Sequence, residues 1–382
     1  MRILLLRSHA GYYGVDRMVV ELAEGWQQLG HEPCVGISGR ADESDESFVD
    51  ACRQRQLAYR LFVSKSPTDV ETVAAMNEWI KVFKPHVIHS HGYKADVLAW
   101  LANRSLQRPL MGTCHPWLGT SDSLRMKCYA VLDKLLLTRF DKVTAISETV
   151  KAECALGPFR RRDIQVISNG VDLEEDGRPH DTESLRRRWH LDLQAFIIGV
   201  VGRLSVEKGQ RLLLPAFADV CRSTARPLML LLIGDGPDRS CLEEQACKLG
   251  LQQRVKFLGY QQEIPALLSC LDLFVMPSLS EGLPLALLEA MAAGRAILAT
   301  DVGEIGSVLD HGRAGMIVEP NRSDKLAAGM LHLIEQPELC ATMARQAQTL
   351  ARNNYSRAHM ATQYQQAYRT LFHEKELQTH AR

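Results

Sequence analysis

The most informative stretch of the sequence is LFVMPSLSEGLPLALLEAMAAG, residues 273–294. Its first four residues are apolar and predict a buried strand, and the polar residues that follow predict a loop. Pro284 suits the first turn of a helix, and Gly294 suits the end of that helix. A strand, a loop and a helix N-terminus in this order form a candidate anion site, because the free N–H groups of the helix point at the loop.

Two glutamates in this stretch are eight positions apart. Glu281 lies in the expected loop, and Glu289 lies about a turn and a half into the expected helix. At ~1.5 Å rise per residue their axial separation is at most about 12 Å, which is comparable with the distance from a hexose to a ribose across a diphosphate. Taken alone, such a pair is more typical of one solvated and one capping glutamate. Its interpretation depends on the rest of the chain.

The same strand, loop and helix pattern recurs along the whole sequence. Residues 172–190 are polar and charged and predict an exposed hinge between two halves. Two doubly wound α/β halves place a ligand cleft between them, at the carboxyl ends of their strands. We expect domains at 1–172 and 173–355 and a last helix at 356–382. The expected strands are 2–6, 87–89, 110–113, 142–146 and 164–167, then 196–202, 228–234, 255–258, 273–276, 296–300 and 315–318.

The last helix has one apolar face. It follows a break at 353–356 and is either an ordinary terminal helix of the second domain or a helix that crosses back onto the first, which we favour. The residues on this face are Met360, Tyr364, Ala367, Tyr368 and Leu371.

Composition excludes several classes of protein. The 382 residues suggest two domains at ~150 residues each, and 45 basic residues balance 45 acidic ones, so no overall charge attracts nucleic acid. The ten cysteines are scattered without a C-x-x-C pair, which indicates a reducing compartment. The N-terminus predicts no signal peptide, and no apolar run reaches the ~18 residues of a membrane span. We expect a cytoplasmic protein, and contact with the inner face of the cytoplasmic membrane stays open.

A second group of residues supplies positive charge. Gly202 and Arg203 end the first strand of the second half, and Lys208 and Gly209 follow shortly after. Cations there can neutralise a departing diphosphate without a metal, although ordinary surface charge is the alternative.

These motifs together resemble glycosyltransferase family 4. The resemblance implies a GT-B fold, with two Rossmann-like domains facing each other across a cleft. It also implies retaining, metal-independent transfer of a sugar from a nucleotide sugar to an acceptor hydroxyl, in bacterial polysaccharide, lipopolysaccharide or glycolipid synthesis. The motifs that carry it are Gly202-Arg203, Lys208-Gly209, Gly234-Asp235-Gly236-Pro237, Ser280-Glu281-Gly282 with Glu289, and Asn169-Gly170-Val171-Asp172.

The resemblance assigns the donor to the second domain. It implies that Arg203 and Lys208 beside Gly202 hold the diphosphate, that Glu289 holds the ribose, and that Glu281 holds the transferred sugar. Other matching positions are the backbone amides of Gly282 and Leu283, and Tyr260 and Ile264 near the base.

The first domain would bind the acceptor. Gly14 matches the family's glycine loop, where a missing side chain lets ligand phosphate and sugar approach. His115 matches the loop histidine that faces the donor sugar. Two segments depart from the family pattern: 12–17 lacks adjacent glycines and a glutamate before Arg17, and 301–307 lacks the usual second glycine and downstream glutamate.

The sequence also contains features that could indicate a metal site, a lipid contact or another function. His86, His89 and His91 suggest a metal site, since His89 and His91 share a strand face. No third ligand with suitable spacing accompanies them, so we expect no metal. We also expect no cofactor beyond the donor substrate, a UDP-, GDP- or ADP-sugar. The basic run 160–162 is a solvated turn or a contact for a lipid-linked acceptor. One rival function is a non-catalytic nucleotide-sugar-binding subunit. Another, an NAD-dependent oxidoreductase, lacks G-x-G-x-x-G after the first strand.

Overall fold

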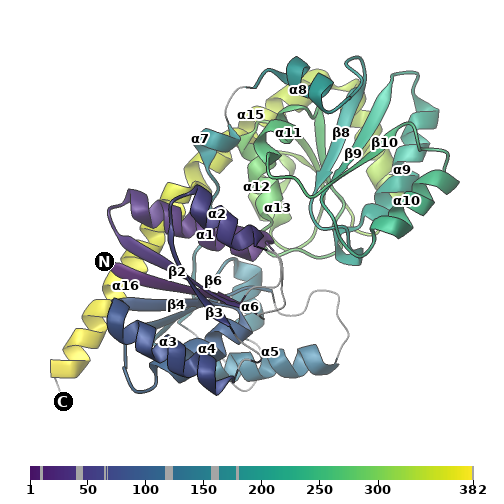
Figure 1. Cartoon of the computed structure of the whole chain (residues 1–382). Helices are drawn as coiled ribbons and strands as arrows, with labels where there is room; N and C mark the ends of the chain where they lie inside the picture. The colour runs from purple at the N-terminus through teal and green to yellow at the C-terminus, as the bar shows by residue number, and fades with distance from the viewer. Residues whose placement is uncertain are drawn as a thin grey trace. The chain divides into compact units, whose positions relative to one another are not determined.

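The computed structural model describes residues 1–8, 12–39, 46–63, 66, 68–116, 124–155, 163–177 and 180–380. The chain forms two compact units, each a parallel β-sheet covered by helices (Figure 1). The first unit comprises Met1–Gly170 and Arg357–Arg382, and the second comprises Val171–Ser356. The change of unit therefore falls two residues before the expected boundary at 172, and the last helix belongs to the first unit.

The first sheet has seven parallel strands in the described residues, in the order β3-β2-β1-β4-β5-β6-β7. The order reverses between β1 and β4, and open α/β sheets bind ligands at the carboxyl ends of the strands on either side of such a reversal. Arg7 of β1 pairs in register with His91 of β4 at this edge. The strands are β1 (Arg2–Ser8), β2 (Glu32–Gly39), β3 (Ala58–Val63), β4 (Val87–His91), β5 (Leu110–Cys114), β6 (Lys142–Ala145) and β7 (Gln165–Val166).

The second sheet repeats this plan with six described strands, in the order β10-β9-β8-β11-β12-β13. Its order reverses between β8 and β11, and the segments that begin at Gly202 and Pro277 leave the sheet there. The strands are β8 (Phe196–Val201), β9 (Leu228–Ile233), β10 (Val255–Gly259), β11 (Leu273–Met276), β12 (Ala296–Thr300) and β13 (Met316–Val318).

Helices cover the two sheets. Those of the first unit are α1 (Gly14–Gln28), α2 (Ser47–Gln54), α3 (Val70–Phe83), α4 (Tyr93–Asn103), α5 (Leu124–Leu137), α6 (Glu148–Ala155) and α16 (Arg357–His380). Those of the second unit are α7 (Leu173–Asp176), α8 (Thr182–Arg188), η1 (Val206–Lys208), α9 (Gln210–Ser223), α10 (Arg239–Lys248), α11 (Ile264–Ser269), α12 (Leu285–Ala292), α13 (Ile305–Val308), η2 (Asp310–Gly312), α14 (Ser323–Glu335) and α15 (Pro337–Asn354).

The central strands are buried on both faces. Ile3, Leu4 and Leu5 are fully buried, as are Leu230, Leu231 and Leu232. Continuous apolar runs of this kind are typical of parallel strands with helices on each side. No helix in the described parts of the chain is long and apolar enough to cross a bilayer.

Two features differ from the sequence-based expectation. Strands β2 and β3 were not expected, because Pro33, Gly36 and Gly39 weaken the strand pattern of β2, and β3 is an edge strand with mostly exposed side chains. The segment 172–190 is not a plain hinge, since it forms the short helices α7 and α8, capped by the side chains of Asp172 and Asp181. Its exposure misled the prediction: no residue of α8 is buried.

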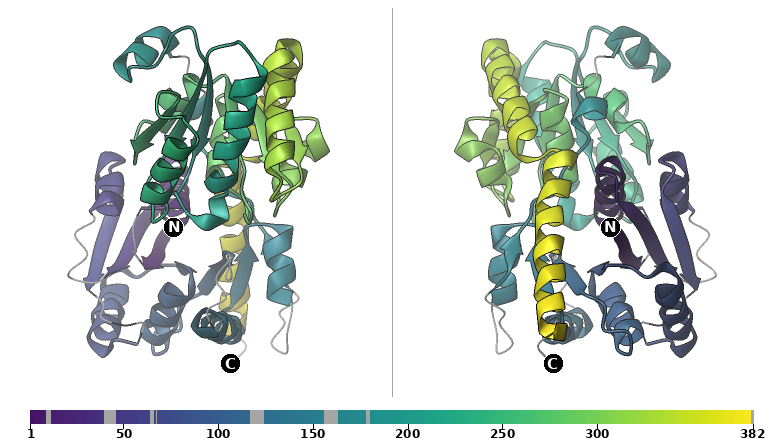
Figure 2. Two further views of the ribbon diagram at one scale, coloured as in Figure 1. Left: turned by 90° about the vertical axis from the view of Figure 1, so that its right-hand side faces the viewer. Right: turned by 90° about the vertical axis from the view of Figure 1, so that its left-hand side faces the viewer.

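Helix α16 packs on the first unit through the expected face. Met360, Tyr364 and Tyr368 are at most 1% exposed, and α16 lies against α1 (Figure 2). At its start, the buried Arg357 donates from Nε to Glu21 Oε2 of α1 at 2.6 Å. This ion pair and the apolar face tie the end of the chain to the first sheet.

Candidate active site

The loop after β11 brings Glu281 into a defined set of contacts. Glu281 Oε1 accepts hydrogen bonds from Ser278 Oγ and from Lys208 Nζ, each at 2.7 Å, and the side chain is 7% exposed. Pro284 is the N-cap of α12 with an extended backbone, so the helix begins one residue later than expected. Gly294, with φ 63°, follows the end of the helix. The loop, the helix start and a cation therefore meet at one place.

Lys208 is the cation at this place, and it is more exposed than its partner. Its side chain is 26% exposed, and it ends the short helix η1 that follows β8. A lysine ammonium has three N–H donors, so the bond to Glu281 leaves donors for an anion. The structure thus joins two predicted site residues that are 73 positions apart.

Close backbone contacts hold these loops together. Gly209 has φ 68°, and a Cβ there would lie 2.0 Å from the carbonyl oxygen of Pro277. Gly303 has φ 57°, and a Cβ there would lie 2.1 Å from the carbonyl oxygen of Glu281. Only glycine fits such positions. Gly303 belongs to the segment 301–307, which the sequence analysis noted only as a departure and which the structure connects to the Glu281 loop.

Gly202 and Arg203 leave β8 beside this loop system. The backbone of Gly234 lies against Gly202, where a Cβ on Gly234 would be 2.0 Å from the Gly202 carbonyl oxygen. The Arg203 side chain is exposed, and its carbonyl oxygen accepts a hydrogen bond from Gln210 Nε2 at 2.9 Å. This hydrogen bond holds the backbone of Arg203 in place.

The remaining predicted donor residues differ in exposure. Glu289 is 1% exposed within α12, and Leu283 is 6% exposed. The carbonyl oxygen of Gly282 accepts the Glu304 N–H at 3.2 Å. Of the two residues expected near a base, Tyr260 is 50% exposed after β10, whereas Ile264 is buried at the start of α11.

The first unit contributes Gly14 at the start of α1. A Cβ at Gly14 would meet no atom of the described residues within 4 Å. Asp16, the third residue of the helix, caps its N-terminus: Oδ2 of Asp16 accepts the Tyr13 N–H at 3.0 Å. Its Oδ1 pairs with Arg7 Nε at 2.8 Å.

His115 follows β5 at the same edge of the first sheet. Its Nε2 lies 3.4 Å from Nδ1 of His91. Burial, and then the positive charge of Arg7, lower the pKa of His115 to about 3. The sequence analysis missed Arg7, which a polar residue at the end of an otherwise apolar first strand could have indicated.

Two family models match the chain in sequence. The model described as Glycosyltransferase Family 4 matches residues 12–175, and the model described as Glycosyl transferases group 1 matches residues 181–350. The chain is also 31% identical, over 307 residues, to the D-inositol 3-phosphate glycosyltransferase of Rhodococcus erythropolis, with 74% of this chain and 67% of the relative covered. The chain belongs to glycosyltransferase family 4.

This family 4 chain is also similar to a further relative in sequence and to a solved structure in fold. The N-acetyl-alpha-D-glucosaminyl L-malate synthase of Bacillus anthracis is 27% identical over 309 residues, which cover 79% of each chain. The crystal structure of Anabaena HepE in complex with UDP-glucose superposes with a TM-score of 0.86 at 25% identity, covering 97% of this chain and 100% of that one. The protein is a glycosyltransferase with the α/β architecture of the GT-B fold.

The other histidines of the transferase have structural partners. His89 Nε2 is 2.6 Å from Thr113 Oγ1, and its Nδ1 bonds the Tyr368 hydroxyl. His86 Nδ1 accepts the Arg2 N–H at 2.9 Å. In the described part of the chain no group of three His, Cys, Asp or Glu side chains is arranged to hold a metal ion. The basic run 160–162 lies outside the described residues.

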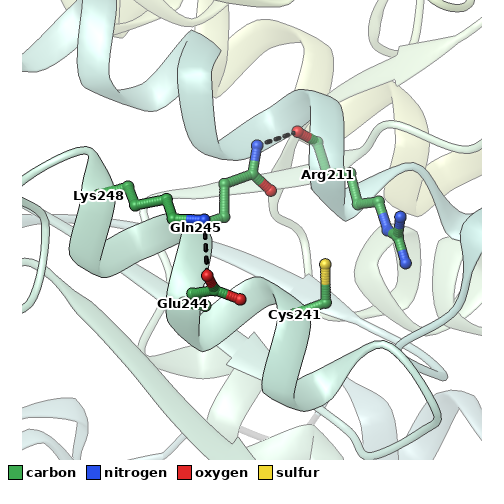
Figure 3. Close-up of a pocket in the computed structure, with 5 residues that line it drawn as sticks. All are labelled: Arg211, Cys241, Glu244, Gln245 and Lys248. Carbon is green, nitrogen blue, oxygen red and sulfur yellow. Dashed lines mark hydrogen bonds and ion pairs between the residues drawn. The ribbon is translucent and has the colours of Figure 1, made fainter.

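A surface pocket of about 290 Å³ lies elsewhere on the second unit (Figure 3). The residues that line it bond one another: Gln245 Nε2 donates to the backbone carbonyl oxygen of Arg211 at 3.0 Å, and Lys248 pairs with Glu244 at 2.6 Å. The pocket contains none of the predicted donor residues, and its lining comes from the faces of α9 and α10. The lining residues are Arg211, Cys241, Glu244, Gln245 and Lys248.

Proposed function

We propose that this glycosyltransferase moves a hexose-type sugar from a nucleoside-diphosphate sugar to an acceptor hydroxyl, with retention at the anomeric carbon and without a metal. The observation that carries the proposal is the Lys208–Glu281 pair at 2.7 Å beside the start of α12. A carboxylate suited to sugar hydroxyls and a cation suited to a diphosphate lie together there. The UDP-glucose bound to HepE supports a nucleotide-sugar donor, and the relative in Rhodococcus erythropolis is likewise a glycosyltransferase.

The donor would be held by the second unit. In this proposal Arg203 and Lys208 bind the diphosphate, while the N-terminus of α12 adds its partial positive charge. Glu289 binds the ribose and Glu281 the sugar. Gly202, Gly282 and Leu283 offer backbone around the phosphate and sugar, and the exposed Tyr260 with Ile264 borders the base.

The acceptor would be held by the first unit. The start of α1 at Gly14 and the neutral His115 face the carboxyl edge of the first sheet, where open α/β sheets bind ligands. We assign to His115 a hydrogen bond with the transferred sugar. A histidine with a pKa near 3 is a poor proton acceptor at neutral pH.

Retention follows from this distribution of groups. Inversion needs a general base opposite the leaving group. Retention can proceed on one face, where the departing phosphate accepts the acceptor's proton while Arg203 and Lys208 stabilise its charge. Covalent attack by Glu281 is the less favoured retaining route, since Lys208 and Ser278 already occupy its Oε1.

The stereochemistry tests this mechanism directly. Proton NMR of the first-formed product from an α-linked donor should show an α-linkage. A β-linked product would overturn the retaining mechanism. The donor itself can be found by thermal-shift measurements with UDP-, GDP- and ADP-sugars, because a bound ligand raises the unfolding temperature.

We further propose that the enzyme works in the cytoplasm on bacterial polysaccharide, lipopolysaccharide or glycolipid precursors, and contacts the inner face of the membrane when the acceptor is lipid-linked. Helix α5 supports this contact, since Val131, Leu132 and Leu135 are 39–59% exposed on it. Co-sedimentation with anionic vesicles should fall when Leu132 and Leu135 are both replaced by Ser. Equal binding by wild type and variant would contradict this use of α5.

A further inference from the structure

Three imidazoles, tilted relative to one another, form an array at the edge of the first sheet. His89 and His91 project from the same face of β4, with ring centroids 4.2 Å apart, and the ring of His115 lies 5.7 Å from that of His91. His89 and His91 are fully buried. Only His115, at the end of β5, is partly exposed. The array therefore leads from the core to a residue of the proposed site.

The two ends of the array differ in how their hydrogen bonds are satisfied. Both ring nitrogens of His89 have partners, in Tyr368 of α16 and Thr113 of β5. His91 has only one: its Nδ1 faces His115 Nε2 at 3.4 Å, while its Nε2 is buried without a partner among the described residues. The contact between His91 Nδ1 and His115 Nε2 therefore contains one proton, which is bonded to one of these two nitrogens.

Both rings are neutral. Burial is the largest cause that lowers the pKa of His91 well below its ordinary value, and electrostatic interactions with His89, His115 and Arg7 act in the same direction. Arg7 also donates from Nη1 to the His91 carbonyl oxygen at 3.2 Å. A positive charge on either imidazole would therefore be repelled by the guanidinium of Arg7.

Two neutral arrangements remain. In the first, His91 Nδ1–H donates to His115 Nε2 and leaves a bare lone pair on His91 Nε2. In the second, His115 Nε2–H donates to His91, and the proton of His91 must then sit on Nε2, as a buried N–H without an acceptor. Buried N–H groups without an acceptor are rarer in proteins than buried acceptors without a donor. The first arrangement is therefore preferred.

We propose that His91 is a positioning residue that fixes His115 as the Nδ1–H tautomer, so that His115 presents a hydrogen-bond donor to its ligand. The ring nitrogen that carries the proton is set by the bond that the other nitrogen makes. Nδ1 of His115 has no protein partner in the described structure. Its role toward a sugar hydroxyl rests on the proposed function, whereas the tautomer does not.

The tautomer can be measured without any assay of transfer. Long-range ¹H–¹⁵N correlation spectra of the protein labelled with ¹⁵N-histidine distinguish protonated from unprotonated ring nitrogens, and His115→Asn and His91→Asn assign the signals. We expect His115 and His91 both to be protonated at Nδ1, from pH 8 down to pH 5. Protonation of His115 at Nε2, or titration of either ring near neutral pH, would overturn the inference.

Matched variants test what the tautomer does. The amide of His91→Asn can replace the Nδ1 donor, whereas His91→Leu keeps similar volume without a donor. We expect kcat of His91→Leu to be about tenfold below that of His91→Asn, with similar donor KM, because one hydrogen bond to His115 is lost. His91→Leu should also show a mixture of His115 tautomers. If His115 in His91→Leu is protonated only at Nδ1, as we expect for the wild type, the positioning role of His91 is contradicted.

Substitutions at His115 separate this inference from the proposed function. His115→Asn keeps an N–H close to the Nδ1 position, and His115→Gln places it close to Nε2. We expect the Asn variant to be about tenfold more active than the Gln variant. If both match the wild type while the wild-type spectrum shows Nδ1–H, the sugar contact fails and the tautomer assignment stands.

Discussion

Glu281 is the residue on which the donor side of the site depends. Its side chain is almost fully buried, and Lys208 and Ser278 both donate to the same carboxylate oxygen, Oε1. Replacing Lys208 therefore removes a proposed phosphate ligand and leaves a buried carboxylate with one hydrogen-bond donor fewer.

The first prediction concerns the two cations. Lys208→Ala and Arg203→Ala should each lower turnover by ~10²-fold or more, because positive charge on the departing diphosphate is lost. Glu289→Ala should chiefly raise the donor KM. Steady-state kinetics check this, with Lys325→Ala as the control, since Lys325 is exposed on α14. Near-normal kinetics in both cation variants would remove them from the site.

The second prediction concerns pH and the buried His89. Burial lowers its pKa to about 3, against 6.5 for an ordinary histidine. Between these values the unfolded state binds more protons than the folded state, so stability falls as the pH falls below about 6.5. At full slope the loss is about 1.4 kcal/mol per pH unit for this group. His89→Gln should be less stable at pH 7.5 but lose less stability on acidification.

Denaturant titrations at pH 7.5, 6.5 and 5.5 measure this slope. Four of the five tryptophans lie in the first unit by sequence, so a Trp189→Phe background makes fluorescence report on that unit. If the free energy of unfolding changes equally with pH in the wild type and in His89→Gln, the prediction is contradicted.

At the scale of elements, the site depends on loops that touch through backbone. The turn before α9 meets the loop after β11 at Gly209, and Leu279 N–H donates to the Glu207 carbonyl oxygen at 2.8 Å. These contacts hold together the two loops that carry Lys208 and Glu281.

The third prediction compares two glycines of nearly equal backbone conformation. Gly209 has φ 68° and no room for a Cβ, whereas Gly250 has φ 69° and open space around it. Gly250→Ala should cost about 1 kcal/mol in stability and keep donor affinity, because only backbone strain is added. Gly209→Ala must also separate the two loops, so it should lose donor binding, measured by calorimetry. Equal donor affinity in the two variants would show that the loop contact is unimportant.

At the scale of the whole molecule, the same plan occurs twice. Each sheet reverses its strand order once, and loops that carry predicted ligand residues follow strands at that reversal. Gly14 follows β1 in the first unit, and Gly202 and the Glu281 loop follow β8 and β11 in the second.

The fourth prediction concerns the complete reaction. The proposed phosphate site consists of Arg203, Lys208 and a helix N-terminus, so transfer should continue in excess EDTA. Activity assays after dialysis against chelator test this. Complete loss of transfer, restored by Mg²⁺ or Mn²⁺, would show that a metal carries the phosphate charge.

Local patterns in the sequence determined much of this protein. Apolar runs marked β8, β9, β11 and β12, because a strand buried on both faces has to be apolar throughout. The apolar face of α16 was visible from helical spacing, and the resemblance to family 4 singled out Lys208, Glu281 and Glu289. The edge strand β3 and the interrupted β2 escaped because they lack that continuous pattern.

Only the tertiary structure decided which of these residues meet. Lys208 and Glu281 are 73 positions apart, and no local pattern states that a Gly209 without a Cβ lets their loops touch. The histidine array and Arg7 likewise depend on the register of β1, β4 and β5 and on two tyrosines that arrive from α16. Contacts between distant segments are set by strand order and packing, and neither is encoded in the spacing of neighbouring residues.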